Sequence, residues 1–160
     1  MLDEKDTAIL TLIQQNCKYT ARKIAEKINS PITTVFAKIK RMEKMGIIKG
    51  YKAVLNHKKL GYGATAFILA SVSYERKKET LNIPQRVVAE HIAKFPEVQE
   101  VHIISGDWDL LIKVREKNVE TVGKFVVDKL RTVEGIERTL TCMVFDTEKE
   151  TTDIVVPKKI

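Results

Sequence analysis

The hydrophobic residues at the start of the chain recur at steps of three and four, which is the spacing of amphipathic helices. After Asp3, a candidate N-cap, the apolar residues Ile9, Leu10 and Ile13 predict a first helix that ends near residue 15. A second periodic stretch begins after Thr20, another candidate N-cap, and predicts a helix of about two turns. The chain therefore opens with two short helices.

A third helix is predicted between Ser30-Pro31 and Gly46. Asn29 tolerates the left-handed conformation that ends the second helix. Ser30 is then the expected N-cap, and Pro31 the expected first helical residue, where its missing N–H costs nothing. Gly46 ends the helix as its C′ residue. Outside the apolar stripe of this helix lie Thr33, Thr34, Ala37, Lys38, Lys40, Arg41 and Lys44.

Alternating residues and runs rich in strand-forming apolar residues predict strands in the rest of the chain. Residues 47–55 predict a strand that leaves the helical unit, and residues 56–63 predict a hinge. Further strands are expected at 64–74, 98–104, 109–115 and 136–145, helices at 84–96 and 118–132, and a charged connection at 75–79. The order βαββαβ is the ferredoxin-like arrangement, with both helices on one face of an antiparallel sheet. Apolar residues on the other face predict self-association.

The positive charge of the chain is concentrated at its start. The 160 residues carry a net charge of +7, and residues 1–60 hold thirteen Lys and Arg against five Asp and Glu, whereas residues 61–160 hold fifteen against sixteen. A basic first module and a nearly neutral second one indicate a polyanion as the first partner and something else as the second. The composition is globular, with no membrane-length apolar run and no signal peptide, so a cytoplasmic protein without membrane contact is expected.

The helix-turn-helix spacing gives the basic module a chemistry suited to DNA. Threonine bonds base edges or phosphates, while Lys and Arg neutralise phosphates and reach guanine in the major groove. The competing interpretation is an ordinary solvated basic face. The candidate DNA-binding residues are Thr20, Arg22, Ser30, Thr33, Thr34, Ala37, Lys38, Lys40 and Arg41.

No pattern in the chain predicts catalysis. The histidines His57, His91 and His102 lack the spacing of metal ligands, and Cys17 and Cys142 are far apart, which indicates two reduced thiols. Neither a GxSxG motif nor a phosphate-binding glycine loop occurs. We therefore expect no catalytic residue, no metal site, no cofactor and no enzyme activity.

One polar group of residues is suited to a small molecule. Backbone amides exposed at Gly106, together with a carboxylate from Asp107 or Asp109, fit the carboxylate and ammonium groups of an amino acid. By spacing alone, an ordinary hairpin turn with Trp108 as a packing residue is the alternative. The candidate effector-binding residues are Ser105, Gly106, Asp107, Asp109, Thr139 and Thr141.

Five stretches of the chain, taken in order, resemble the Lrp/AsnC (leucine-responsive, or feast/famine) family of prokaryotic transcriptional regulators. Residues 2–10 (LDEKDTAIL) are similar to its LDxxDxxIL opening, and residues 35–50 (VFAKIKRMEKMGIIKG) to its recognition-helix segment. Residues 51–61 resemble the strand and the KLG hinge that follow. Residues 101–112 (VHIISGDWDLLI) resemble the family's VxxxTGxxDxLL, and residues 135–144 its GVxxTxTxxV ending.

This resemblance implies an α+β chain with a winged-helix-like helix-turn-helix domain at 1–55, a hinge at 56–63 and a ferredoxin-like effector-binding and oligomerisation domain at 64–160. It matches Gly106 and Asp109 to the effector loop of the family, and Thr139 and Thr141 to its strand threonines. The implied function is sequence-specific binding of double-stranded DNA, modulated by a small-molecule effector, an amino acid. The implied assembly is a homodimer that forms octamers or other higher oligomers.

The sequence departs from the family pattern in three places. The helix-turn-helix turn reads Asn29-Ser30-Pro31, so the docking register is not carried over, and Phe36-Ala37 precede Lys38, so base specificity is not carried over. Asp107-Trp108 is the third departure and leaves the identity of the ligand open. Two alternatives stay open. A tetrapyrrole decarboxylase of the haem pathway resembles the family in fold, although the basic first module argues against it. An effector-independent architectural DNA-binding protein is the other.

Overall fold

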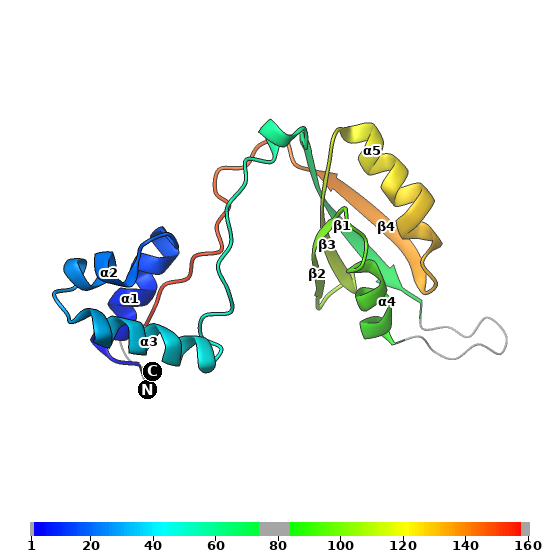
Figure 1. Cartoon of the computed structure of the whole chain (residues 1–160). Helices are drawn as coiled ribbons and strands as arrows, with labels where there is room; N and C mark the ends of the chain where they lie inside the picture. The colour runs from blue at the N-terminus through cyan, green and yellow to red at the C-terminus, as the bar shows by residue number, and fades with distance from the viewer. Residues whose placement is uncertain (1, 74–83, 158–160) are drawn as a thin grey trace. The chain divides into compact units, whose positions relative to one another are not determined.

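The computed structural model describes residues 2–73 and 84–157 (Figure 1). Tyr74, the last residue of the first predicted strand of the second module, and the charged connection expected at 75–79 lie outside these residues. The chain divides into two compact units, one formed by residues 1–54 with 149–160 and the other by residues 55–148. In the described part of the chain, no helix is long and apolar enough to cross a membrane.

The first unit contains the three predicted helices, α1 (Glu4–Gln15), α2 (Ala21–Lys27) and α3 (Ile32–Lys44). A capping box begins α1, because Asp3 and Asp6 each accept a hydrogen bond from the backbone N–H of the other. As predicted, Asn29 ends α2 in the left-handed region with φ of 48°, and Gly46 ends α3 with φ of 70°. The helices enclose a small core made of Leu2, Ile9, Ile24, Ala25, Val35 and Met42.

The predicted cap of α3 is wrong by one residue. Pro31 is itself the N-cap, since its ψ of 141° is not helical and its carbonyl accepts the first hydrogen bond of the helix, from the N–H of Val35 at 3.1 Å. The Ser30 hydroxyl instead accepts a hydrogen bond from Lys5 Nζ of α1 at 3.3 Å. The hydroxyl is therefore engaged by the neighbouring helix and does not cap α3.

The strand predicted at residues 47–55 is also wrong. Among the described residues no strand pairs with this segment, and most of its side chains are exposed. The N–H groups of Ile47 and Ile48 bond to the carbonyl of Met42, so they close α3 and do not extend a sheet. Alternation of side chains cannot make a strand where no second strand satisfies its backbone groups.

The end of the chain lies with the first unit, although sequence reasoning placed all of residues 64–160 in the second domain. The Gln14 side chain of α1 bonds to Ile154 at both of its polar atoms, accepting from the N–H at 2.9 Å and donating to the carbonyl at 3.0 Å. Thr7 Oγ1 donates to the Pro157 carbonyl at 3.2 Å. These contacts join groups far apart in the sequence, which the local sequence pattern does not reveal.

The second unit is a four-stranded antiparallel sheet with helices on one face. Its strands are β1 (Ala64–Val72), β2 (Val98–Ile103), β3 (Leu110–Glu116) and β4 (Ile136–Met143), in the order β2-β3-β1-β4. The helices are α4 (Gln85–Ile92) and α5 (Val119–Lys124), which continues as a π-turn (Phe125–Lys129) and a 3-10 turn (Leu130–Thr132). A 3-10 turn at Lys58–Leu60 occupies the expected hinge. This arrangement confirms the ferredoxin-like prediction.

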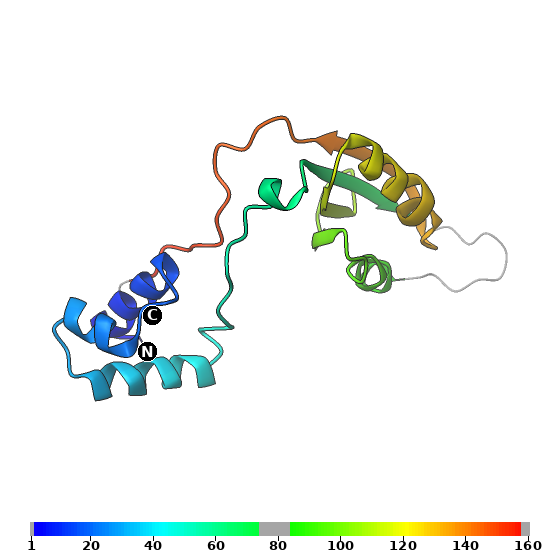
Figure 2. The ribbon, with the colours of Figure 1, turned by 45° about the horizontal axis from the view of Figure 1, so that its top comes forward.

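The core of the second unit lies between the helices and one face of the sheet. Ile68 of β1 pairs with Ile112 of β3, and both are fully buried in a cluster that includes Val88 of α4 and Val122 of α5. Figure 2 shows the ribbon of the sheet and its helices from a second direction. On the other face, Phe67, Leu69 and Leu111 keep part of their surface exposed, and Leu140 is 46% exposed. The predicted apolar residues on the second face are therefore present, among polar neighbours.

Candidate DNA-binding face and effector site

The third helix, α3, has two functionally different sides. Val35 and Met42 are completely buried in the core of the first unit. Lys38 lies beside them, three residues after Val35 and four before Met42, and therefore points to the same side of the helix. The opposite side is exposed and carries Thr33, Ala37, Lys40 and Lys44.

Lys38 and Arg41 bind carboxylates of α1. Asp6 is fully buried, and its Oδ1 lies 3.1 Å from Lys38 Nζ while its Oδ2 lies 2.5 Å from Arg41 Nη2. Lys38 also forms an ion pair with Asp3, and its side chain is only 15% exposed. These four side chains, the Asp6 network, clamp α1 onto α3.

The Asp6 network also shifts the pKa values of Asp3 and Lys38. The hydrogen bond from Lys38 is the main cause that lowers the pKa of Asp3 from 3.8 to about 2. Burial lowers the pKa of Lys38, but its hydrogen bonds with Asp3 and Asp6 outweigh burial and raise that pKa above its usual value. Lys38 therefore stays charged at neutral pH and is neutralised by partners within the protein.

The exposed side of α3 carries a second, looser set of contacts. Lys40 Nζ lies 2.9 Å from Glu43 Oε2 and 5.9 Å from the centre of the Phe36 ring. The Tyr51 hydroxyl donates to Glu43 Oε1 at 2.9 Å. Burial and the Glu43 carboxylate raise the pKa of Tyr51 to about 12, while Lys40 and Tyr51 lower the pKa of Glu43. Lys40 is exposed and can leave Glu43 for a phosphate at little cost.

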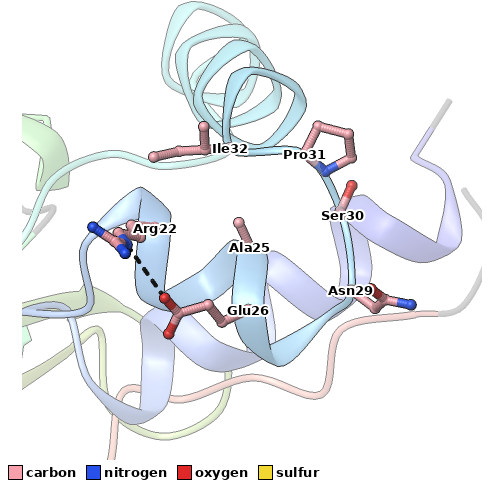
Figure 3. A pocket seen from close by; sticks show the side chains of 7 residues that line it. All are labelled: Arg22, Ala25, Glu26, Asn29, Ser30, Pro31 and Ile32. Carbon is pink, nitrogen blue, oxygen red and sulfur yellow. Dashed lines mark hydrogen bonds and ion pairs between the residues drawn. The ribbon is translucent and has the colours of Figure 1, made fainter.

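The turn between α2 and α3 forms an open concavity of about 480 Å³ (Figure 3). Arg22 and Ala25 of α2 line it opposite Ile32 of α3, and Arg22 is held 3.4 Å from Glu26. Thr20, at the start of α2, accepts a hydrogen bond from the N–H of Lys23 at 3.2 Å. The remaining lining residues are Asn29, Ser30 and Pro31.

The structure thus separates the DNA-binding residues expected from the sequence. It brings Thr33, Ala37 and Lys40 onto one exposed strip of α3, and it places Thr20 and Arg22 at the exposed start of α2. Thr34 is half-buried, Ser30 contacts Lys5, and Lys38 and Arg41 face α1. Sequence reasoning left out Lys44 and Phe36, although helical spacing from Lys40 puts both on the exposed side.

In the second unit, Asp109 serves the fold. One of its oxygens accepts a hydrogen bond from the Val72 N–H at 2.8 Å, and the other accepts from Gln85 Nε2 at 2.5 Å. The carboxylate therefore ties the end of β1 to the start of α4. Gln85 carried no signal in the sequence, because its role depends on where the helix begins.

The rest of the loop at residues 105–108, the candidate effector loop, lies beside β4. Ser105, Gly106 and Asp107 are exposed, and Gly106 has a φ of 110°, which suits glycine. Arg138 stacks on the Trp108 ring at 4.5 Å, and its Nη2 donates to the Asp107 carbonyl at 3.4 Å. Arg138 was not among the residues predicted for this site. The sequence signal that could have indicated it is a basic residue directly before Thr139.

The strand threonines lie on the side of the sheet that faces the helices. Thr139 pairs with Ala70, and Thr141 pairs with Ile68, so their side chains share a face with these buried residues. Thr139 is half-buried and Thr141 is exposed, since β4 is an edge strand. Arg138 belongs to the opposite face, which separates it from the two hydroxyls.

Other candidate chemistry is sparse. Within residues 2–73 and 84–157, no three His, Cys, Asp or Glu residues lie close enough together to hold a metal ion. Cys17 and Cys142 are exposed free thiols.

The chain matches two family models. Residues 2–49 match a winged helix-turn-helix DNA-binding model, and residues 65–154 match the Lrp/AsnC ligand-binding domain. An uncharacterised HTH-type transcriptional regulator of Pyrococcus abyssi is 45% identical over 94% of this chain and 97% of its own length. The HTH-type transcriptional regulator FL11 of Pyrococcus furiosus is 35% identical over 98% and 97% of the two chains.

Solved structures agree with this match. A transcriptional regulator of Neisseria meningitidis, in complex with L-Met, superimposes with a TM-score of 0.87 over 99% of this chain and 98% of its own, at 25% identity. AsnC of Escherichia coli shares the fold, with a TM-score of 0.83 over 96% and 98% of the two chains, at 22% identity. The chain therefore belongs to the Lrp/AsnC family of DNA-binding transcriptional regulators and carries the ligand-binding domain of that family.

Proposed function

We propose that this regulator recognises a specific pseudo-palindromic DNA site as a dimer or higher oligomer, and that an amino acid bound to its second unit changes that recognition. The exposed strip of α3 carries the proposal. It offers hydroxyl, methyl and ammonium groups from Thr33, Ala37, Lys40 and Lys44 to a major groove, while the Asp6 network holds the other side of the helix.

Two further features favour DNA as the partner. The excess of positive over negative charge is confined to residues 1–60. Arg22 and Thr20 lie at the exposed start of α2, the helix that crosses the phosphate backbone in helix-turn-helix proteins. We assign base and backbone contacts to the α3 strip and phosphate contacts to the start of α2. Lys38 is assigned to the fold, and Arg41, which remains 47% exposed, to the rim of the interface.

The effector part of the proposal rests on the loop at residues 105–108 and on the Neisseria relative. That regulator was solved with L-Met, a zwitterion whose ammonium needs an acceptor and whose carboxylate needs donors. In this chain Arg138 donates to the backbone carbonyl of Asp107, whose residue is exposed. The carboxylate and the guanidinium of these two residues carry the charges that suit the ammonium and the carboxylate of an amino acid. Both oxygens of Asp109 are bound to Val72 and Gln85, so we assign Asp109 to positioning the loop.

The test is a selection of duplexes from a random pool with the full chain, followed by titration of the selected duplex and a scrambled one over a salt series. We expect tight, selective binding that weakens steeply with salt. Binding that ignores sequence at every salt concentration contradicts a regulator with a specific site.

The effector is tested by repeating the titration with a mixture of the twenty amino acids. We expect the affinity or the size of the complex to change, and Asp107→Ala to reduce the response while selective binding is kept. Identical curves with and without the mixture contradict the effector proposal and favour architectural, effector-independent binding.

A further inference from the structure

We infer that Phe36 reads thymine, by contact of its ring with the 5-methyl group in the major groove. The inference rests on the proposed binding of DNA by α3 and adds to it the base that the helix selects.

Phe36 is the large apolar side chain at the centre of the exposed part of α3. It is 57% exposed, and Ile32, one turn earlier on the same side of the helix, is 48% exposed. Lys40, one turn later, holds its ammonium 5.9 Å from the ring centre. Ile32, Phe36 and Lys40 therefore form one row along the helix, apolar at its start and cationic at its end.

The chemistry of this row matches thymine better than guanine. Among the four bases, only thymine presents a methyl group in the major groove, and apolar side chains such as Phe and Ala contact it. Guanine is read by a pair of donors, usually from Arg or Lys. The exposed cation one turn after Phe36 is Lys40, which Glu43 binds at 2.9 Å, and the next cation, Arg41, is bound to the buried Asp6.

The charge around the row argues for DNA as its occupant. Lys40 and Lys44 follow Phe36 on the same helix, and Arg22 lies across the concavity from Ile32. An apolar ring at the centre of a basic surface fits the groove of a polyanion, where phosphates flank the methyl groups. A second copy of this chain would bring the same cations against each other. Whether a second copy covers Phe36 is tested by the oligomeric state of Phe36→Ala.

The test uses the duplex that the full chain selects from a random pool. The thymines of a half-site are replaced one at a time by deoxyuridine, which pairs with adenine in the same way and lacks only the methyl group. We expect the wild-type protein to lose about fourfold in affinity at one thymine of each half-site, the loss that corresponds to one buried methyl group. Phe36→Ala should bind the thymine duplex more weakly and should be insensitive to the same replacement.

Matched controls separate the contact from general damage. Phe145→Ala removes a fully exposed phenyl ring from the second unit and should keep the wild-type sensitivity to deoxyuridine. Lys40→Ala should weaken binding to every duplex and leave the thymine effect in place. Far-UV circular dichroism and sedimentation should show the same fold and oligomeric state for Phe36→Ala as for the wild type.

Three results overturn the inference. It fails if the wild-type protein binds selectively but tolerates every replacement, or if Phe36→Ala remains as sensitive as the wild type. It also fails if Phe36→Ala loses its oligomeric state, because Phe36 is then a subunit contact. In these three cases the wild-type protein still binds its duplex selectively, so the proposed function stands. A wild-type protein that binds every duplex equally refutes the proposed function itself.

Discussion

Replacing Lys38 by alanine should destabilise the first unit, because Lys38 neutralises a carboxylate that water cannot reach. Asp6 is fully buried, and Lys38 Nζ lies 3.1 Å from its Oδ1. Removing one partner of a buried ion pair costs about 3–5 kcal/mol, since the other charge is left uncompensated. Here Arg41 and the Asp3 N–H still bind Asp6, so we expect a loss of about 2 kcal/mol in the free energy of unfolding.

Urea unfolding of the full chain measures this loss, with two probes for the two units. Trp108 is the only tryptophan and lies in the second unit, so its fluorescence follows that unit. Circular dichroism at 222 nm includes the helices of the first unit. We expect Lys38→Ala to move the circular dichroism transition to lower urea and to leave the fluorescence transition in place. Lys44→Ala, on the exposed side of the same helix, should stay within about 0.5 kcal/mol of the wild type.

The salt dependence of DNA binding tests whether Lys38 stabilises the fold or contacts DNA. If Lys38 belongs to the fold, Lys38→Ala should keep the salt dependence of binding under conditions where the variant is folded. The opposite result is a Lys38→Ala variant that is as stable as the wild type and has a shallower plot of log affinity against log salt. A slope reduced by about one unit would show that Lys38 contacts a phosphate.

Three further predictions concern other contacts. The folded pKa of Asp3, about 2, lies below its unfolded value of 3.8. The ion pair of Asp3 therefore stabilises the first unit above about pH 4, and this stabilisation is lost as the pH falls toward 2. Asp3→Asn should remove this acid sensitivity in a pH titration followed by circular dichroism. Gln14→Ala should cost about 1 kcal/mol and speed hydrogen exchange of the Ile154 N–H, whereas Gln15→Ala should leave that exchange unchanged. Asp109→Ala should lower the stability of the second unit by about 1–3 kcal/mol in the Trp108 fluorescence transition, because it strips the Val72 N–H of its acceptor, and Asp107→Ala should not.

The sequence predicted those elements whose cause is local. Asp3 and Thr20 cap the helices that follow them, and Asn29 and Gly46 take the left-handed conformations that end helices. Alternation predicted β2 and β3, while a run rich in strand-forming apolar residues predicted β1 and the break at Gly135 placed the start of β4. The ferredoxin-like order then followed from the sequence of elements.

The sequence did not predict what depends on distant neighbours. Residues 47–55 alternate like a strand, but no described strand pairs with them. Helical spacing alone places Lys38 at the border of the apolar stripe, and only the position of Asp6 on α1 shows which way its ammonium turns. Asp109 likewise matches a ligand in its motif, yet the start of α4 brings Gln85 against it.

The most direct test of the central claim, that the exposed side of α3 reads DNA, is the affinity of Ala37→Glu for the duplex that the wild-type protein selects. Ala37 is exposed at the centre of the strip, and glutamate is a good helix former, so the helix should persist while a negative charge faces the groove. Ala93→Glu, at an exposed position of the second unit, is the matched control. We expect selective binding to fall by at least about 100-fold for Ala37→Glu and to be unchanged for the control. Equal affinity of Ala37→Glu and the wild type would contradict the account.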